Sequence, residues 1–392
     1  MRDAYRKNHF DTNLLFIIFL FMIISCFSIY SSEKYLPDPP NHYAFKQVRW
    51  YFIGIVLSAC VYVLDFEQIK KISLFSYIFG ILVLITLHFS PESIARKIKG
   101  AKSWFSVPGF GSIQPSEFMK IFLIIFLAKI IVDHNKKYVD RSLKTDFRLI
   151  FKVFSATAIP LGLILLQPDA GTGMVIIVIL IGMLFLSGIS WKIVGLLGVM
   201  GSSILGVLVL IYTKAPDLLL IFLDTYQLDR IHSWLDPFQY KGDIGYQLSQ
   251  SILAIGSGTM YGKGYYSGQV YIPEAHSDFI FTTIGEEYGF LGGSVVITLY
   301  FILIYRIVAI ALLNKGSYEN LIAAGVVSML TFHIFENIGM VMGLVPITGI
   351  PLPLLSYGGS SILGTLIALS LILNISAKTK KYMFEQDSTR DL

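Results

Sequence analysis

Charged residues are scarce in this chain. Only 15% of its 392 residues are Asp, Glu, Lys or Arg, whereas a soluble domain carries about 25%. Hydrophobic residues make up 54% of the sequence, and the mean hydropathy is +0.66. This composition excludes a soluble globular protein and indicates an integral membrane protein.

Cysteine is almost absent as well. Cys26 and Cys60 both lie in apolar stretches, which predicts buried free thiols and argues against a disulfide framework or a metal site built on cysteine. No small-residue cleavage site follows the first apolar stretch, so we expect a retained helix there. The sequence also lacks a long internal repeat and a second soluble domain. Residues 1–392 are therefore interpreted as a single polytopic domain.

Apolar runs, in contrast, recur along the whole chain. Each is long enough to cross a hydrocarbon core of roughly 30 Å as a helix. We therefore predict an all-α bundle of about ten transmembrane helices. The predicted spans are residues 14–30, 51–64, 74–89, 117–132, 153–166, 174–186, 193–212, 279–310, 321–342 and 361–375. A large polar loop, residues 213–278, separates the seventh span from the eighth.

Lysine and arginine mark one side of this bundle. They precede the first span and follow the second, fourth, sixth, eighth and tenth, and the positive-inside rule makes that side cytoplasmic. We therefore expect both termini, including the tail 378–392, in the cytoplasm and the loop 213–278 outside. The net charge of +5 needs no nucleic-acid partner, because a cytoplasmic membrane face accounts for it.

One basic cluster breaks this rule. Arg96, Lys97, Lys99 and Lys102 lie in a loop that the count of spans places outside, on the same side as Arg49. These residues either contact anionic lipid headgroups or bind a phosphorylated ligand, for which Lys and Arg supply charge-assisted hydrogen bonds. Both interpretations stay open at this point.

Two acidic residues and one lysine, namely Glu117, Asp169 and Lys120, lie at the predicted outer side of the bundle. Glu117 and Lys120 are three residues apart at the start of the fourth span. Lys120 lies one turn deeper, where an ionisable group is costly unless it faces a cavity or a partner, so we predict a functional pair that faces a cavity. Asp169, in a turn between spans five and six, is interpreted first as a helix cap.

Three further features concern the last third of the chain. Asp278 stands where the outer loop meets the eighth span, as either a helix cap or a functional carboxylate. His333, Glu336 and Asn337 share one helix face, a spacing more typical of interhelical hydrogen bonding than of a metal site. The uncharged stretch 343–361 predicts a re-entrant segment, because irregular backbone at membrane depth must lie against protein or a water-filled cavity.

Several motifs in this order resemble the SEDS proteins (shape, elongation, division and sporulation), the RodA and FtsW group, over essentially the full chain. The matching stretches are KGAKSW at 99–104, QPSEFMK at 114–120, QPDAGT at 167–172, Arg230 with WLDP at 234–237, GYQ to AIGSG at 245–258, PEAHSDF at 273–279 and LSYGGSS at 355–361. Residues 335–349 resemble the rod-shape branch more than the division branch.

The resemblance implies a peptidoglycan glycosyltransferase that polymerises lipid II at the outer face of the bacterial cytoplasmic membrane during cell elongation. It implies a class B penicillin-binding protein transpeptidase and other membrane proteins of the elongation complex as partners. Asp278 matches the family's essential aspartate, and a positioned carboxylate can act as the general base. The predicted substrate-binding residues are Glu117, Lys120, Asp169, Lys102, Arg49, Arg230 and Ser356.

The resemblance implies no organic cofactor, and we predict no metal site built from protein side chains. A divalent cation, Mg²⁺ or Mn²⁺, could neutralise the leaving pyrophosphate. Two other function classes stay open. A lipid II flippase is one, because intramembrane ionisable residues and a re-entrant segment are equally typical of transporters; a non-catalytic scaffold for cell-wall enzymes is the other. The product separates them, since only a polymerase makes glycan strands.

Overall fold

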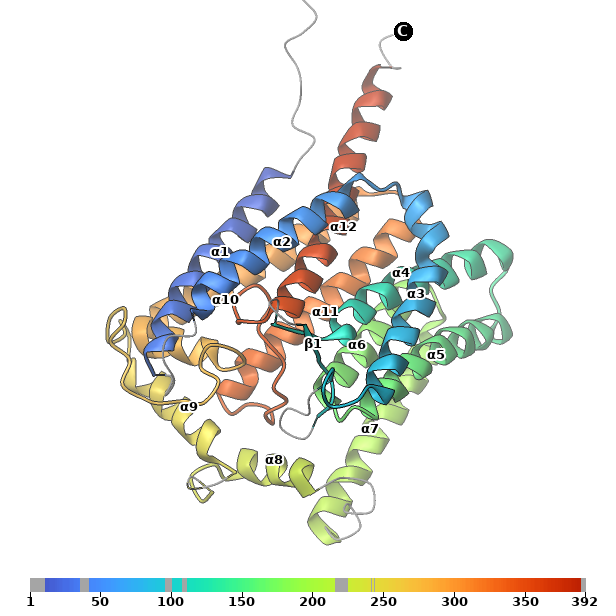
Figure 1. Ribbon diagram of the computed structural model, residues 1–392. Coiled ribbons are helices and arrows are strands. Elements are labelled where there is room, and N and C mark those ends of the chain that lie inside the picture. Colours follow the sequence, from blue (N-terminus) through green and yellow to red (C-terminus); the bar gives the residue numbers. More distant parts are fainter. Residues whose placement is uncertain are drawn as a thin grey trace, which may run out of the picture.

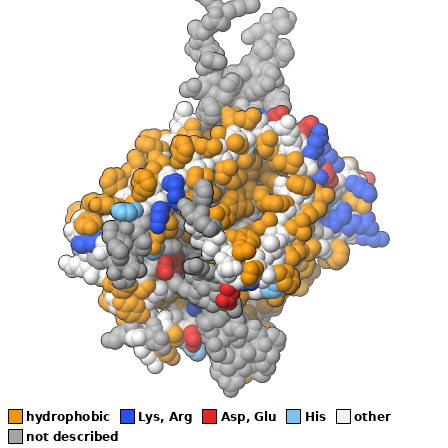
Figure 2. Space-filling model, viewed as in Figure 1, with side chains coloured by type: hydrophobic (Ala, Val, Ile, Leu, Met, Phe, Trp, Pro, Cys, Tyr) orange, Lys and Arg blue, Asp and Glu red, His pale blue; other side chains and the backbone are white. Residues whose placement is uncertain are grey.

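The computed structural model describes residues 11–35, 42–95, 101–107, 111–215, 225–240, 242 and 244–388. Within these ranges the chain forms a bundle of long α-helices and one small β-hairpin (Figure 1). Hydrophobic side chains cover much of the face shown in Figure 2. An apolar exterior over a helical bundle is the arrangement that a bilayer requires.

Ten helices coincide with the ten predicted spans. They are α1 (Thr12–Ser32), α2 (Tyr43–Val63), α3 (Phe66–Phe89), α4 (Pro115–Lys137), α5 (Leu143–Leu165), α6 (Ala170–Leu186), α7 (Trp191–Lys214), α10 (Ile280–Leu313), α11 (Ser317–Val341) and α12 (Gly359–Ser388). Eight of them are long and apolar enough to cross a membrane, and α6 is apolar but shorter. The tenth is α4, whose first turns carry Glu117 and Lys120. The prediction of an all-α polytopic membrane protein is confirmed.

The sequence did not predict four short elements. Two strands, β1 (Phe105–Val107) and β2 (Gly111–Ile113), form an antiparallel hairpin before α4. The loop 213–278 contains α8 (Thr225–Leu235) and α9 (Tyr246–Ser257). Helices of this length are marginal by themselves, and tertiary contacts hold them here: Nε1 of Trp234 in α8 donates to the Gly343 carbonyl (2.9 Å), and α9 packs on α10.

Polar contacts join the helix ends at one end of the bundle. Asp11 bonds to Arg306 and Ser376, Lys378 pairs with Asp65 and Asn314 donates to Thr379. The loop between α4 and α5, rich in Lys and Arg, belongs to this end through the Lys70–Asp133 ion pair. We call it the basic end. The prediction that successive spans cross the membrane in opposite directions is therefore correct for these helix ends.

An ion pair between buried Asp11 and partly exposed Arg306 fastens α1 to α10 at the basic end. Arg306 donates from Nε to Oδ1 (3.1 Å) and from Nη2 to Oδ2 (2.6 Å) of Asp11, whose Oδ1 also accepts from the Leu14 amide (3.1 Å) and so caps α1. Burial by itself raises the pKa of Asp11, but the hydrogen bonds from Arg306 and Leu14 outweigh it and hold the pKa below its usual value. The bidentate geometry is the stronger form of such a pair.

The eighth predicted span is not one continuous helix. Gly289 interrupts α10 with φ 62° and ψ −158°, a conformation that favours glycine. The carbonyl of Glu286 accepts from the Lys263 amide (3.0 Å), and the Phe290 amide donates to the Thr259 carbonyl (2.9 Å). The loop after α9 thus satisfies backbone groups that the break releases, as a buried interruption requires. The predicted span over 279–310 is confirmed, and the break at Gly289 was not predicted.

Candidate active site

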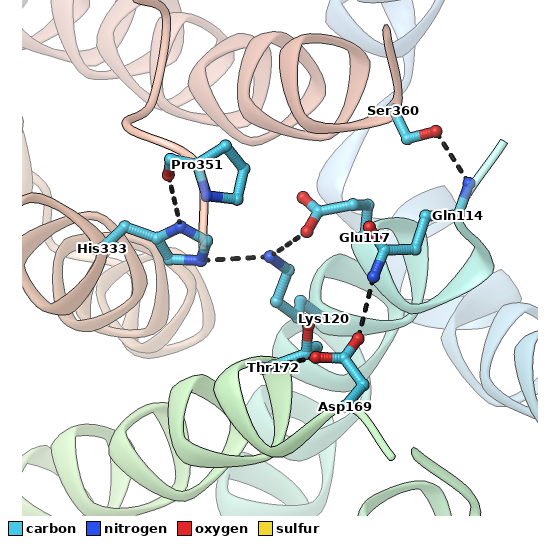
Figure 3. A network of polar contacts seen from close by, with 8 residues as sticks. All are labelled: Gln114, Glu117, Lys120, Asp169, Thr172, His333, Pro351 and Ser360. Atoms are coloured by element: carbon cyan, nitrogen blue, oxygen red, sulfur yellow. Dashed lines mark hydrogen bonds and ion pairs between the residues drawn. The ribbon is translucent and has the colours of Figure 1, made fainter. Parts of the chain in front are cut away.

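Lys120 lies at the centre of a buried polar cluster in the first turns of α4 (Figure 3). Its Nζ donates to Oε1 of Glu117 (2.8 Å) and lies 3.1 Å from Nε2 of His333 on α11. Pro115 opens α4 at its first turn, and the spacing of three places Glu117 and Lys120 on one face. The pocket that these side chains line holds no space for a water molecule. The predicted pair is therefore assembled, but in a closed pocket.

Asp169 joins the starts of three helices (Figure 3). Its Oδ1 accepts from the Thr172 amide (3.0 Å), so it caps α6, and its Oδ2 accepts from Nε2 of Gln114 (2.8 Å). The Gln114 amide in turn donates to Oγ of Ser360 at the start of α12 (2.8 Å). The interpretation of Asp169 as a helix cap is confirmed. A role in substrate binding stays a prediction.

The segment 343–358 runs between α11 and α12 without helical structure. The predicted re-entrant stretch is therefore irregular over most of its length, and α12 begins within its last three residues. Buried side chains satisfy its carbonyl groups: Oγ of Ser25 donates to Leu355 (2.8 Å), and the Tyr300 hydroxyl donates to Pro353 (2.5 Å). Bonds of this kind allow irregular backbone inside a membrane protein.

The polar face of α11 holds this segment in register. Oγ1 of Thr348 donates to Oε1 of Glu336, Nδ2 of Asn337 donates to the Ile350 carbonyl (2.8 Å), and Nδ1 of His333 lies 3.4 Å from the Pro351 carbonyl. We expected interhelical hydrogen bonds from these three side chains. The His333 contact with Lys120 is one. The contacts with Thr348, Ile350 and Pro351 instead run to the segment 343–358, because that segment folds back against α11.

Asp278 approaches the same segment from the start of α10. Nδ2 of Asn337 donates to the Asp278 carbonyl as well (2.7 Å). Oδ2 of Asp278 faces Gly349, because a Cβ atom added at Gly349 would lie 3.5 Å from this oxygen. The N-cap position of α10 belongs to Phe279, which argues against the alternative that Asp278 is the cap. Asp278 is half-buried.

Arg230 and Glu336 lie in the same region. Nη1 of Arg230 on α8 donates to the Thr348 carbonyl (3.3 Å), and the hydroxyl of the same Thr348 donates to Glu336. Glu336 is only 4% exposed, and among the described residues its Oε2 has no hydrogen-bond partner. Two carboxylates and an arginine therefore meet beside the segment 343–358, a constellation suited to proton transfer.

Ser356 lies close to Asp278 because it contacts Ser277, the residue before Asp278. Its Oγ donates to the Ser277 carbonyl (2.7 Å) and accepts from the Leu352 amide (2.8 Å). The side chain thus fastens the turn 352–356 to the residue that precedes Asp278. This contact stabilises the site, and a direct substrate contact by Ser356 stays a prediction.

The other two predicted cations lie elsewhere. Nζ of Lys102 donates to the carbonyls of His88 (3.0 Å) and Ser90, at the end of α3. The Arg49 guanidinium lies over the Trp50 ring, with Cζ 5.8 Å from the ring centre. The structure therefore does not bring either group to Asp278 through these contacts. The remaining basic residues of the predicted outer cluster, at 96, 97 and 99, lie outside the described residues.

The sequence did not point to two buried acids, Glu286 and Glu287. Oε1 of Glu286 accepts from Nζ of Lys263 (2.6 Å) and from the Gln269 amide (2.8 Å), and Glu287 accepts from the Ser31 hydroxyl. They hold the loop that leads from α9 to Asp278. Adjacent acids inside an apolar run are a signal of function or of buried pairing, and this signal could have identified them.

The described residues contain no group of three or more His, Cys, Asp and Glu side chains that could hold a metal ion. Asp278 and Glu336 supply two carboxylates, and Mg²⁺ is commonly held by one or two carboxylates together with substrate phosphates. A divalent cation therefore stays a prediction, and it enters no step proposed below.

We predict that Lys120→Ala lowers the free energy of unfolding by about 3–5 kcal/mol, because it leaves the buried Glu117 carboxylate unpaired. The double variant Glu117→Gln/Lys120→Met should recover most of this loss, since neutral groups need no partner charge. Denaturant unfolding in detergent measures both, with Lys136→Ala on the exposed face of α4 as the control. A double variant as unstable as Lys120→Ala would show that packing, and not charge, holds the cluster.

Comparison with known proteins agrees with this architecture. A family model described as "Cell cycle protein", which covers FtsW, RodA and SpoVE, matches residues 7–381. Stage V sporulation protein E of Bacillus subtilis is 36% identical over 375 residues, which cover 93% of this chain and 94% of the relative. A probable peptidoglycan glycosyltransferase FtsW of Trichlorobacter lovleyi is 33% identical and covers 97% of this chain and 96% of its own length.

Solved structures are similar over the same extent. One similar chain comes from a peptidoglycan synthase complex described for its structural coordination of polymerization and crosslinking. It superposes with a TM-score of 0.75 at 27% identity, and the match covers 94% of this chain and 98% of that chain. The rod shape determining protein RodA of Thermus thermophilus gives a TM-score of 0.67 at 26% identity, with 95% and 98% covered. The chain therefore belongs to the FtsW, RodA and SpoVE family of cell cycle proteins, the SEDS family that its motifs resemble.

Proposed function

We propose that this protein is a peptidoglycan glycosyltransferase that polymerises lipid II, with Asp278 as the general base. The observation that carries the proposal is the meeting of half-buried Asp278 with Glu336 and Arg230 beside the segment 343–358. Relatives that align over nearly the whole chain carry the name peptidoglycan glycosyltransferase, which supports this substrate class.

In the proposed reaction, the 4-hydroxyl of one lipid-linked sugar attacks the anomeric carbon of another. The new C–O bond forms as the bond to the lipid pyrophosphate breaks, and Asp278 takes the proton of the attacking hydroxyl. The pyrophosphate leaves with increased negative charge, which a nearby cation stabilises. Arg230 is the predicted cation that the described contacts bring to the Asp278 region. Lys120, in its closed pocket, would act only after that pocket opens.

We also propose a class B penicillin-binding protein as the partner transpeptidase, together with other membrane proteins of the elongation complex. The similar structure from a complex that combines polymerization with crosslinking supports such a partner. The role in elongation rests on residues 335–349, which resemble the rod-shape branch. The sequence relatives named above are a sporulation protein and an FtsW, whereas one similar structure is a rod shape determining protein. Deletion of the gene, with cell shape as the readout, tests the role in elongation.

Asp278→Asn should abolish glycan polymerisation, with a loss of at least about 100-fold, because it keeps the side-chain size and removes the basic carboxylate. The assay uses purified protein, with and without a co-expressed transpeptidase, and labelled lipid II. Asp140→Asn in the exposed loop between α4 and α5 is the control and should keep full activity, and thermal stability should be unchanged in both. Polymer formed by Asp278→Asn within a few-fold of the parent rate would refute the assignment.

The same preparation separates the alternative function. A lipid II flippase would move the lipid across sealed vesicles and make no glycan strands, whether or not Asp278 is replaced. Transport without polymer from the parent protein would favour this alternative.

We propose further that the basic end is cytoplasmic and that the loop containing α8 and α9 is outside, because basic loops stay on the cytoplasmic side. Single cysteines at Lys136 and Asp236, in a variant without Cys26 and Cys60, should react with an impermeant thiol reagent from opposite sides. In intact cells only the cysteine at 236 should label. Labelling at 136 alone would reverse the orientation, and equal labelling of both would contradict the ten-span count.

A further inference from the structure

A pocket of about 700 Å³ opens at the basic end between α3, α4 and α5, far along α4 from Glu117 and Lys120. Its volume is within the range of about 300–1,000 Å³ that is typical of sites for small molecules. Its apolar lining, here called the apolar wall, comes from Leu74, Phe126, Phe151 and Ile159. Three lysines of α4 and α5 line the same pocket, Lys129, Lys137 and Lys152.

The three lysines outnumber the acids of the pocket. Among the described residues, none of them forms an ion pair or a hydrogen bond; Nζ of Lys137 lies 5.7 Å from the centre of the Tyr138 ring. The pocket contains one acid, Asp133, but Lys70 pairs with it at 2.5 Å. Figure 2 shows Lys and Arg side chains gathered at the right of the view, where the ends of α4 and α5 lie in Figure 1. The local charge is strongly positive.

The lysines lie at two depths. Lys129 precedes Lys137 by eight residues on α4, which is about 12 Å along the helix axis. An ionisable group at that depth is costly unless it has a partner, although the long side chain can extend toward the headgroup level. Lys137 ends α4 and is exposed. Lys152, nine residues into α5, is exposed as well. The positive charge therefore extends from the headgroup level toward the apolar wall.

The apolar wall faces the lipid. Phe151 is 71% exposed and Ile159 is 52% exposed, and both lie on α5, a helix long and apolar enough to cross the membrane. A soluble anion would satisfy the lysines but would leave this wall uncovered. A lipid with an anionic headgroup covers both, with its phosphate at the lysines and an acyl chain along the wall.

We propose that the pocket between α3, α4 and α5 binds an anionic phospholipid, whose phosphodiester lies between Lys129, Lys137 and Lys152. The site is separate from the Asp278 region and does not depend on the proposed polymerase activity. Because α4 also carries Glu117 and Lys120 at its other end, a lipid bound here stabilises the helix that positions them.

The test uses the full-length protein in nanodiscs with equal amounts of phosphatidylglycerol and phosphatidylcholine of the same acyl chains. Native mass spectrometry of the released protein counts the lipids that stay bound. The parent should retain phosphatidylglycerol in preference to phosphatidylcholine. Lys129→Gln/Lys152→Gln should lower that preference by about fivefold for each lysine removed, and Lys129→Arg/Lys152→Arg should preserve it.

The matched control is Lys136→Gln/Lys144→Gln, which removes the same charge from exposed positions outside the pocket. If this control lost as much of the phosphatidylglycerol preference as Lys129→Gln/Lys152→Gln, diffuse surface charge would explain the preference, and the proposal would be overturned. Unchanged phosphatidylglycerol retention in the pocket variant would also overturn it. Displacement of phosphatidylglycerol by equimolar undecaprenyl pyrophosphate would assign the pocket to a polyprenyl ligand instead. If the Gln variant fails to fold, loss of the preference in the folded Arg variant would be the contradicting result.

Discussion

The amide of one buried asparagine joins the two parts of the chain that form the candidate active site. Nδ2 of Asn337 donates to the carbonyl of Asp278 (2.7 Å) and to that of Ile350 (2.8 Å), so both of its hydrogens are used. A buried carbonyl that loses its donor costs about 1–3 kcal/mol, and this side chain satisfies two. The position of Asp278 relative to the segment 343–358 depends on it.

The polar face of α11 extends this role along the helix. His333, about one turn before Asn337, contacts both Lys120 and the Pro351 carbonyl, and Glu336 accepts from Thr348. One helix therefore links the closed Lys120 pocket to the half-buried Asp278 region. These two places suit different tasks, because a carboxylate that acts as a base must reach substrate, whereas a buried ion pair needs only its partner and adjacent hydrogen bonds.

The long helices could be predicted from the sequence because a bilayer imposes a minimum length and an apolar composition on every span. The break at Gly289 could not, since its carbonyl and amide partners come from the loop after α9. Asp278, Glu117 and Lys120 could be identified because ionisable groups at the edge of an apolar run are costly without a function. The sequence did not predict that Glu336 lies near Asp278, because only the fold of the segment 343–358 against α11 brings Thr348 and Gly349 between them.

Hydrogen exchange in Asn337→Ala tests most directly whether this residue fixes the site. The account predicts faster amide exchange in residues 347–352, unchanged exchange in α3 and α5, and at least about a tenfold loss of polymer made from lipid II, since both carbonyls lose their donor. Exchange in residues 347–352 at the parent rate, with polymer formed as in the parent, would contradict it.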